Sequence, residues 1–153
     1  MSTPTQPQTG ADVMAQFIPS SPFVAKLGIV ADVLDADEVR LRLPWDPTNV
    51  TIADMVHGGA IAALADVAVM AAAWAGADVS GGQERSDSGI DLSSLRGVTT
   101  SISMQFLAPA RATDLIAIGR VLRRGKTLVN CDVDVVTPDG EAVAKAIATY
   151  KVG

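Results

Sequence analysis

Hydrophobic and polar positions along the chain repeat with two periods, and each period predicts a different kind of element. Over residues 58–75 apolar side chains recur three and four positions apart, which is typical of a helix with one buried stripe. The stripe consists of Ile61, Leu64, Ala65, Ala68, Ala72 and Ala75. Because most of these side chains are small, we expect the helix to lie close against a sheet.

Strands are predicted on both sides of this helix. Residues 27–43 contain two alternating runs separated by Asp-Ala-Asp, which indicates a hairpin. After the helix, strand-like patterns cover residues 98–106, 116–122, 128–136 and 142–152. The first of them is expected to alternate between one face with Val98, Thr100, Ile102, Met104 and Phe106, and another with Thr99, Ser101, Ser103 and Gln105. A hairpin, a long helix and an antiparallel meander together predict an α+β fold.

The remaining segments define the domain and its connections. Residues 1–18 are expected to form a flexible tail and then a short helix that ends before Pro19. Residues 19–153 are expected to form one domain, because a chain of 153 residues is long enough for one core but too short for two. Residues 49–55 are predicted as an irregular loop, and residues 77–97 as a long loop that is either mobile or functional.

Composition and charge exclude several classes of function. Hydrophobic residues make up 48% of the chain and charged residues 19%, so the chain can bury a core and is unlike a disordered polymer. The net charge is −5 and the single basic cluster lies at residues 123–126, which argues against nucleic acid or a membrane surface as a partner. Cys131 is the only cysteine, so neither an intramolecular disulfide nor Cys/His metal spacing is present, and no metal or other cofactor is expected.

We expect neither a signal for export nor a membrane-spanning segment in these residues. Residues 1–25 contain neither Lys nor Arg and no uninterrupted apolar core, unlike a secretory signal. Residues 60–77 approach the length of a membrane span, but they are rich in alanine and include Asp66. We therefore expect a soluble, cytoplasmic protein.

The segment HGGAIAALAD, from His57 to Asp66, carries the candidate chemistry. Gly58 and Gly59 begin the predicted helix, where amide hydrogens lack intrahelical acceptors and the positive end of the helix dipole points outward. Such a helix start can stabilise an oxyanion, and glycine lets a carbonyl group approach the backbone closely. Asp66 interrupts a run of small apolar residues, where a carboxylate is costly unless it is paired or functional.

Gly58 and Asp66 are too far apart to act on one carbonyl group within a single chain. Asp66 lies eight residues after Gly58, which corresponds to about 12 Å along a helix at about 1.5 Å per residue. A site that uses both therefore requires two subunits, with their central helices antiparallel across a two-fold axis. The spacing predicts a homodimer in which one subunit supplies an amide hydrogen and the other a carboxylate.

Three stretches resemble the hotdog-fold acyl-CoA thioesterases of the PaaI type. They are HGGAIAALAD, GVTTSISMQFLAPA and RRGKTLVNCDVDVVTPDGEAVAKAIATYKV, and the resemblance covers roughly residues 27–152. It implies a curved antiparallel sheet wrapped around the long central helix, in dimers that commonly assemble into tetramers. It also implies that Gly58 of one subunit polarises the carbonyl of an acyl-CoA substrate, while Asp66 of its neighbour attacks that carbonyl or activates water.

The resemblance assigns roles to further residues, and the residues themselves leave each role open. His57 either helps to shape the thioester site or only caps the helix start. Thr99 stands where relatives carry a hydroxyl that holds the attacking water near the aspartate, but threonine is also common in strands. Asp66 itself is either catalytic or a carboxylate satisfied by hydrogen bonds at a subunit interface. A carboxylate suits this reaction, because a thiol leaving group with a pKa of about 8.5 needs little acid assistance.

Two groups of residues are candidates for substrate binding. Gly59 lies beside the expected carbonyl site. The predicted turn RRGK carries three basic side chains, those of Arg123, Arg124 and Lys126. These side chains either contact the phosphates of coenzyme A or remain solvated.

The sequence departs from the family pattern in two places. Relatives often carry an asparagine six residues before the histidine, where Thr51 stands here. Asn49 is two residues too early, so it serves this role only if the loop bulges. The 77–97 segment is longer than usual and either forms a lid or borders the acyl pocket.

These residues leave three functions open. The first is hydrolysis of a small, medium-chain or aromatic acyl-CoA. The second is a hotdog hydratase or dehydratase, although a lone histidine at a helix start argues against the usual pair of a histidine and an acid. The third is an acyl-CoA-binding module without catalysis, which would bind the thioester and release no thiol.

Overall fold

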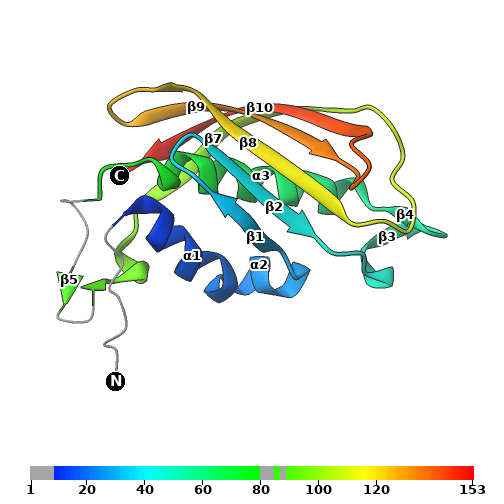
Figure 1. The fold of residues 1–153 in the computed structure, drawn as a ribbon, viewed down its shortest axis with the longest axis horizontal. Helices are drawn as coiled ribbons and strands as arrows, with labels where there is room; N and C mark the ends of the chain where they lie inside the picture. Colours follow the sequence, from blue (N-terminus) through cyan, green and yellow to red (C-terminus); the bar gives the residue numbers. More distant parts are fainter. Residues whose placement is uncertain (1–8, 80–84, 87–88) are drawn as a thin grey trace.

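The computed structural model describes residues 9–79, 85–86 and 89–153 of the chain (Figure 1). Within these residues, a six-stranded antiparallel sheet curves around a long central helix, as the sequence predicts. Most of the predicted flexible tail, residues 1–8, lies outside the described residues.

The sheet joins the early hairpin to the later meander. Its spatial order is β1-β2-β8-β9-β10-β7, and every neighbouring pair is antiparallel. The strands are β1 (Val30–Leu34), β2 (Glu38–Leu43), β7 (Gly97–Phe106), β8 (Leu115–Arg124), β9 (Leu128–Val136) and β10 (Ala142–Val152). The hairpin and the meander predicted from alternation are therefore confirmed. They meet where β2 pairs with β8, which leaves β1 and β7 as the two edges of this sheet.

The central helix α3 (Gly58–Ala75) lies against the concave face of the sheet, where it contacts β8, β9, β2 and β10 (Figure 1). All six residues of the predicted apolar stripe are buried. Gly119 of β8 shows how closely the layers approach, since a Cβ there would lie 3.0 Å from the carbonyl oxygen of Ala68. The helix is long and apolar enough to cross a membrane, yet 61% of it is buried inside the protein, as is usual for a core helix.

The first helix, α1 (Gly10–Ser20), is longer than predicted. It begins with a capping box between Thr9 and Asp12 and packs against α3 and β1. A Cβ at Gly10 would collide with the carbonyl oxygen of Trp74, so glycine permits this close contact. The predicted end before Pro19 is wrong, because the missing amide of this proline removes only one hydrogen bond near the helix end, and the helix stops at the next residue.

A second short helix, α2 (Pro22–Leu27), is not predicted by the sequence pattern. Pro22 occupies its first turn, where proline is favourable because its missing amide hydrogen would have no acceptor there. Gly28 ends the helix at a left-handed φ of 74°. The helix overlaps the predicted hairpin, residues 27–43, only at Leu27.

The loop predicted over residues 49–55 is more ordered than its composition suggests. A 3-10 turn leads into a small hairpin, and these elements are η1 (Pro47–Asn49), β3 (Val50–Ile52) and β4 (Met55–Val56). Ala53 has a φ of 52° in the hairpin turn, so the usual turn signal of glycine or asparagine is absent. Backbone hydrogen bonds of 2.9 Å, from the Val56 amide to the Ala110 carbonyl and from the Ala112 amide to the Asp54 carbonyl, join the hairpin to the β7–β8 connection just before α3. An exposed ion pair of 2.9 Å between Asp54 and Arg111 lies beside these bonds.

The described part of the 77–97 segment contains short elements, namely β5 (Arg85–Ser86), β6 (Gly89–Ile90) and η2 (Leu92–Ser94). β5 and β6 pair as a separate two-stranded sheet. Residues 80–84 and 87–88 lie outside the described residues, so the predicted lid or pocket border remains a prediction.

A bulge in β7 changes which of its side chains face α3. Between two neighbouring pairs, β10 advances by one residue, from Thr149 to Tyr150, while β7 advances by two, from Ser101 to Thr99. Thr100 is therefore an extra residue, and the strict alternation predicted for this strand is wrong at this point. As a result Thr99 lies on the same face as Ile102, Met104 and Phe106.

Candidate active site

Among the described residues, the start of α3 leaves one backbone amide without an acceptor, that of Gly58. Nδ1 of His57 accepts a hydrogen bond from the Gly59 amide at 2.7 Å. The His57 carbonyl accepts from Ala60 at 2.9 Å and from Ile61 at 3.2 Å. The positive end of the helix is therefore concentrated on the Gly58 donor, which can hold an oxygen atom that develops negative charge.

Glycine has a different purpose at each of the two positions. A Cβ at Gly59 would lie 2.9 Å from Nδ1 of His57, so a side chain there would displace the capping ring. A Cβ at Gly58 would lie 3.6 Å from Cε1 of Phe106, which is an ordinary contact. Packing alone therefore does not require glycine at position 58. What glycine provides there is open space beside the free amide.

Asp66 is held in place from the sheet. Oγ1 of Thr99 donates a hydrogen bond to Oδ1 of Asp66 at 2.6 Å, and the bulge at Thr100 is what turns Thr99 toward the helix. Oδ2 of Asp66 has no hydrogen-bond partner in the described part of the chain, and the residue is exposed. A carboxylate with one oxygen fixed and the other accessible can accept a proton from water or attack a carbonyl carbon.

A single chain does not bring the two candidate groups together. Gly58 lies beside Phe106 at one end of β7, whereas Asp66 contacts Thr99 near the other end. Both belong to the same straight element, α3, so the separation of about 12 Å expected from a rise of about 1.5 Å per residue applies.

In the part of the chain that the structure describes, two pockets flank the start of α3. The Phe106 pocket, of about 370 Å³, lies between α3, the β3–β4 hairpin and the end of β7, and is lined chiefly by Thr51, Met55, Val56, Ile61, Phe106 and Leu107. The Phe23 pocket, of about 320 Å³, lies between α3, α2 and η1, and is lined chiefly by Phe23, Leu27, Thr48, Asn49, Val50 and His57. Gly58 borders the first pocket and Gly59 the second.

Asn49 and Thr51 lie on opposite sides of the helix start. The Asn49 carbonyl accepts a hydrogen bond from the His57 amide at 2.8 Å, and the residue borders the Phe23 pocket. Thr51, at the position where relatives carry asparagine, borders the Phe106 pocket together with Gly58. Asn49 thus approaches the histidine and not the free amide.

The basic residues predicted to bind coenzyme A do not form one group. Arg124 turns inward and donates to the Ala73 carbonyl at 2.8 Å and to the Ala72 carbonyl at 3.3 Å, so it caps the last turn of α3. Arg123 and Lys126 are exposed and border a shallow pocket at the β8–β9 turn. Of the three, these two are therefore the ones that are accessible from solvent.

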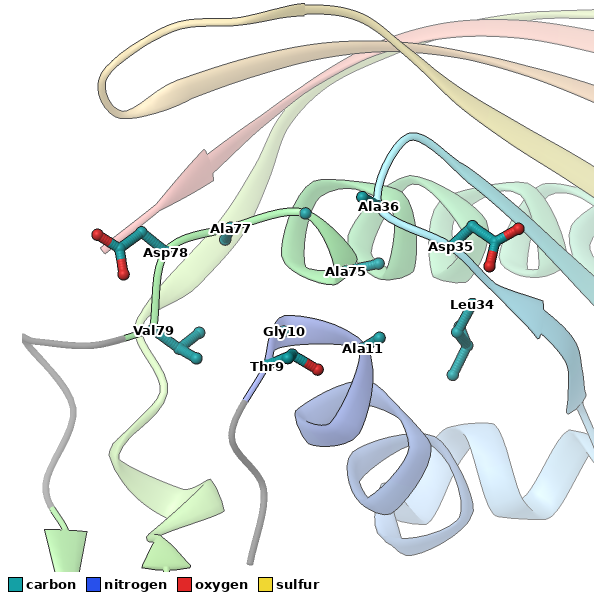
Figure 2. A pocket seen from close by; sticks show the side chains of 11 residues that line it. Thr9, Gly10, Ala11, Leu34, Asp35, Ala36, Ala75, Ala77, Asp78 and Val79 are labelled. Carbon is teal, nitrogen blue, oxygen red and sulfur yellow. The ribbon is translucent and has the colours of Figure 1, made fainter.

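A further pocket lies at the opposite end of α3 (Figure 2). It has a volume of about 460 Å³ and is bordered by α1, the β1–β2 turn and the residues that follow α3. Asp35 and Asp78 are its acidic residues. None of the predicted catalytic residues borders this pocket, so it lies apart from the groups at the start of α3.

One contact near Asp66 is missing from the sequence predictions. Nε1 of Trp74 donates a hydrogen bond to the hydroxyl of Tyr150 at 3.0 Å in the core. Burial raises the pKa of the Tyr150 phenol, the hydrogen bond from Trp74 opposes this, and the charge of Asp66 adds to it. The spacing of four residues puts Asp66, Met70 and Trp74 on one face of α3, but nothing in the sequence pairs that face with Tyr150 of β10.

An antiparallel sheet wrapped around one long helix, with His-Gly-Gly at the helix start, defines a hotdog-fold protein of the thioesterase type. A comparison with protein families matches residues 53–144 to the thioesterase superfamily, and the chain belongs to that family. The resemblance found in the sequence is thus confirmed for family and fold. A comparison with curated proteins gives no match.

Solved structures with the same fold include proteins of this family. A thioesterase family protein from Silicibacter pomeroyi is 23% identical, with a TM-score of 0.76 over 94% of this chain and 99% of that one. The E. coli PaaI protein, from the phenylacetic acid degradation operon, is 20% identical, with a TM-score of 0.75 over 94% of each chain. A hypothetical thioesterase from Streptococcus pneumoniae, solved with coenzyme A, is 20% identical, with a TM-score of 0.61 over 82% of this chain and 85% of that one. At these identities the likeness establishes the fold alone.

Proposed function

We propose that the chain is an acyl-CoA thioesterase that hydrolyses a small, medium-chain or aromatic acyl-CoA. The observation that carries the proposal is the pair of open groups on α3: the Gly58 amide, and the Asp66 carboxylate with one oxygen held by Thr99. Membership of the thioesterase superfamily supports the class of reaction. The S. pneumoniae structure that contains coenzyme A supports the class of substrate.

In the proposed reaction, the thioester carbonyl oxygen accepts a hydrogen bond from the Gly58 amide, which stabilises negative charge as the carbonyl carbon becomes tetrahedral. Asp66 of the neighbouring subunit takes a proton from the attacking water. The intermediate then expels the thiolate of coenzyme A, which receives the proton from Asp66, so the products are a carboxylic acid and a thiol. In the nucleophilic variant Asp66 attacks the carbonyl carbon itself, and water then hydrolyses the mixed anhydride.

The proposed site is completed by a second chain. β7 is an edge strand, and its side chains Ile102 and Phe106 on the face toward α3 remain 41% and 54% exposed. An edge strand with uncovered apolar side chains favours pairing with another strand. A second copy joined through β7 would cover these side chains and set the two α3 helices antiparallel, with Asp66 of each near Gly58 of the other. The proposed assembly is this homodimer, which the family resemblance extends to a homotetramer.

The proposal is tested by measuring thiol release from a panel of acyl-CoAs. Asp66→Asn keeps the size of the side chain but removes its charge, so we expect kcat to fall at least about 100-fold. Asp139→Asn, on the exposed β9–β10 turn, is the matched control and should retain kcat. Full turnover in Asp66→Asn would remove Asp66 from the mechanism. Acyl-CoA binding without thiol release by the wild type would identify a binding module, and hydration of enoyl-CoA would identify a hydratase.

A further inference from the structure

Trp74 and Tyr150 form a polar contact in the core that the proposed reaction does not use. Nε1 of Trp74 donates a hydrogen bond to the hydroxyl of Tyr150 at 3.0 Å, and the two residues are only 3% and 5% exposed. A polar group buried to this degree is costly unless it is hydrogen-bonded, so each side chain holds the other in place. The bond anchors the last turn of α3 to β10.

This anchor lies beside the residue that contacts Asp66. Tyr150 pairs directly with Thr99 across β10 and β7, and the extra residue of the bulge, Thr100, comes next to this pair. Directly paired residues of antiparallel strands point to the same face of the sheet, with Cβ atoms about 4.5 to 5.5 Å apart. Tyr150 and Thr99 are therefore neighbours on the face toward α3. On α3 itself, Asp66 and Trp74 share one face, about two turns apart.

Gly97 of β7 leaves room for the tyrosine ring. A Cβ at Gly97 would lie 2.6 Å from the hydroxyl oxygen of Tyr150 and 2.8 Å from its Cε1. The ring therefore lies against the backbone of β7 two residues before Thr99, where a larger residue would displace it. Tyr150 thus contacts β7 immediately next to the bulge.

The orientation of Thr99 depends on the position of that bulge. Because side chains alternate along a strand, a bulge that moved by one residue toward Gly97 would turn Thr99 to the opposite face, away from Asp66. Resting on the proposed thioesterase function, we infer that Tyr150, held by Trp74, is a positioning residue for the reaction. It keeps Thr99 directed at α3, and Thr99 in turn orients the carboxylate of Asp66.

The first experiment measures steady-state thiol release by Tyr150→Phe, which keeps the ring and removes the hydroxyl. We expect kcat to fall at least about threefold, and by no more than in Thr99→Val, with KM within about twofold of the wild-type value. Gly97→Ala should have the same effect by another route, because its methyl group displaces the Tyr150 hydroxyl. Unchanged kcat in both variants would overturn the inference.

A double-mutant cycle separates positioning from a general loss of stability. If Tyr150 acts through Thr99, Tyr150→Phe should lower kcat no further once Thr99→Val has removed the hydroxyl that it positions. An equal fold loss in both backgrounds would show that Tyr150 acts independently of Thr99 and would overturn the inference.

Val39→Ala is the matched control for stability. Val39 is fully buried on β2, which β8, β9 and β10 separate from β7 in the sheet. Like Tyr150→Phe, it should lower the midpoint of urea unfolding, but it should keep kcat. Loss of kcat in Val39→Ala equal to that in Tyr150→Phe would assign the effect to stability and count against positioning.

A crystal structure of Tyr150→Phe tests the same inference without any activity. The contact from Oγ1 of Thr99 to Oδ1 of Asp66, 2.6 Å in the wild type, should be longer or present in only one of two conformers. A single conformer with this contact unchanged would overturn the inference. Absence of thiol release by the wild type would overturn the thioesterase function, and the structure of the variant would still decide whether Tyr150 positions Thr99.

Discussion

At the scale of single residues, the hydrogen bond from Thr99 to Asp66 sets the orientation of the carboxylate. Its length is 2.6 Å, and it fixes one oxygen while the other stays accessible. Thr99→Val keeps the branched shape and removes the donor. Because hydrogen bonds to charged groups are among the stronger ones, we expect kcat to fall about 10- to 100-fold with little change in KM, measured by steady-state thiol release.

The neighbouring threonine provides the control for this prediction. The hydroxyl of Thr100 donates to the Thr149 carbonyl at 3.2 Å and does not contact the carboxylate. Thr100→Val should therefore keep kcat close to that of the wild type. Equal losses in Thr99→Val and Thr100→Val would show that the strand, and not the hydrogen bond to Asp66, is responsible.

His57 is the second residue whose role a substitution can decide. Its ring caps α3 by accepting the Gly59 amide at 2.7 Å, and asparagine is a favourable residue at such a position whereas alanine is not. We expect His57→Ala to lower the free energy of unfolding by about 1 kcal/mol and His57→Asn to restore most of it, measured by urea denaturation. If His57 acts only as a helix cap, His57→Asn should keep kcat within about threefold of the wild-type value. A large loss of kcat in a stable His57→Asn protein would instead give the ring a part in the reaction.

At the scale of elements, the last turn of α3 is held by a side chain from the sheet. Arg124 of β8 donates to the Ala73 and Ala72 carbonyls at 2.8 and 3.3 Å. Arg124→Gln loses the charge and the reach of the guanidinium, so we expect the free energy of unfolding to fall by about 1 to 2 kcal/mol while KM for acyl-CoA changes little. Thermal or urea unfolding and steady-state kinetics measure the two effects.

The adjacent residue should behave in the opposite way. Arg123 is exposed, so Arg123→Gln should keep the stability of the protein. Because the proposed substrate carries phosphates, the same change should raise KM several-fold. If Arg124→Gln raised KM and Arg123→Gln lowered stability, the division between a capping arginine and a binding arginine would be reversed.

The elements also show which features of the fold can be predicted from sequence patterns and which cannot. The bounds of α3 agree with the predicted residues 58–75, because its period extends over five turns and needs no knowledge of its neighbours. The bulge at Thr100 could not be predicted in this way, since it exists only in the pairing of β7 with the distant strand β10. The β3–β4 turn could not be predicted either, for a local reason. Ala53 has a positive φ there, at a position where glycine or asparagine is usual and would have indicated a turn.

The residues of the candidate site also divide into those that could be selected from the sequence and those that could not. Gly58 and Asp66 could be selected from the sequence because their chemical types are unusual at their places in an apolar helix. The different environments of Arg123 and Arg124 could not, since a bulge between Val121 and Arg123 sets which side chain turns toward α3. Candidate residues can thus be selected from residue type, whereas contacts between distant strands required the structure.

At the scale of the whole molecule, the proposed dimer predicts that two different inactive variants regain activity when they form mixed dimers. Gly58→Pro removes the amide hydrogen at the first helical position, where proline is favourable. His57 already has the extended ψ of 133° that proline requires of the residue before it, so the helix start should keep its shape. Asp66→Ala removes the carboxylate but keeps the amide. Each variant alone should be nearly inactive, because every site in its dimer lacks one of the two groups.

Co-expression of the two variants in equal amounts should return activity. With random pairing, half of the sites receive an intact Gly58 and half of those also receive an intact Asp66, so about one quarter of the wild-type activity per chain is expected in the thiol-release assay. Co-expression of Gly58→Pro with a chain that carries both substitutions is the control and should return none. If both groups came from the same chain, the hybrids would contain no intact site. Activity that stays at the sum of the separate variants, in hybrids verified by native mass spectrometry, would therefore exclude the shared site.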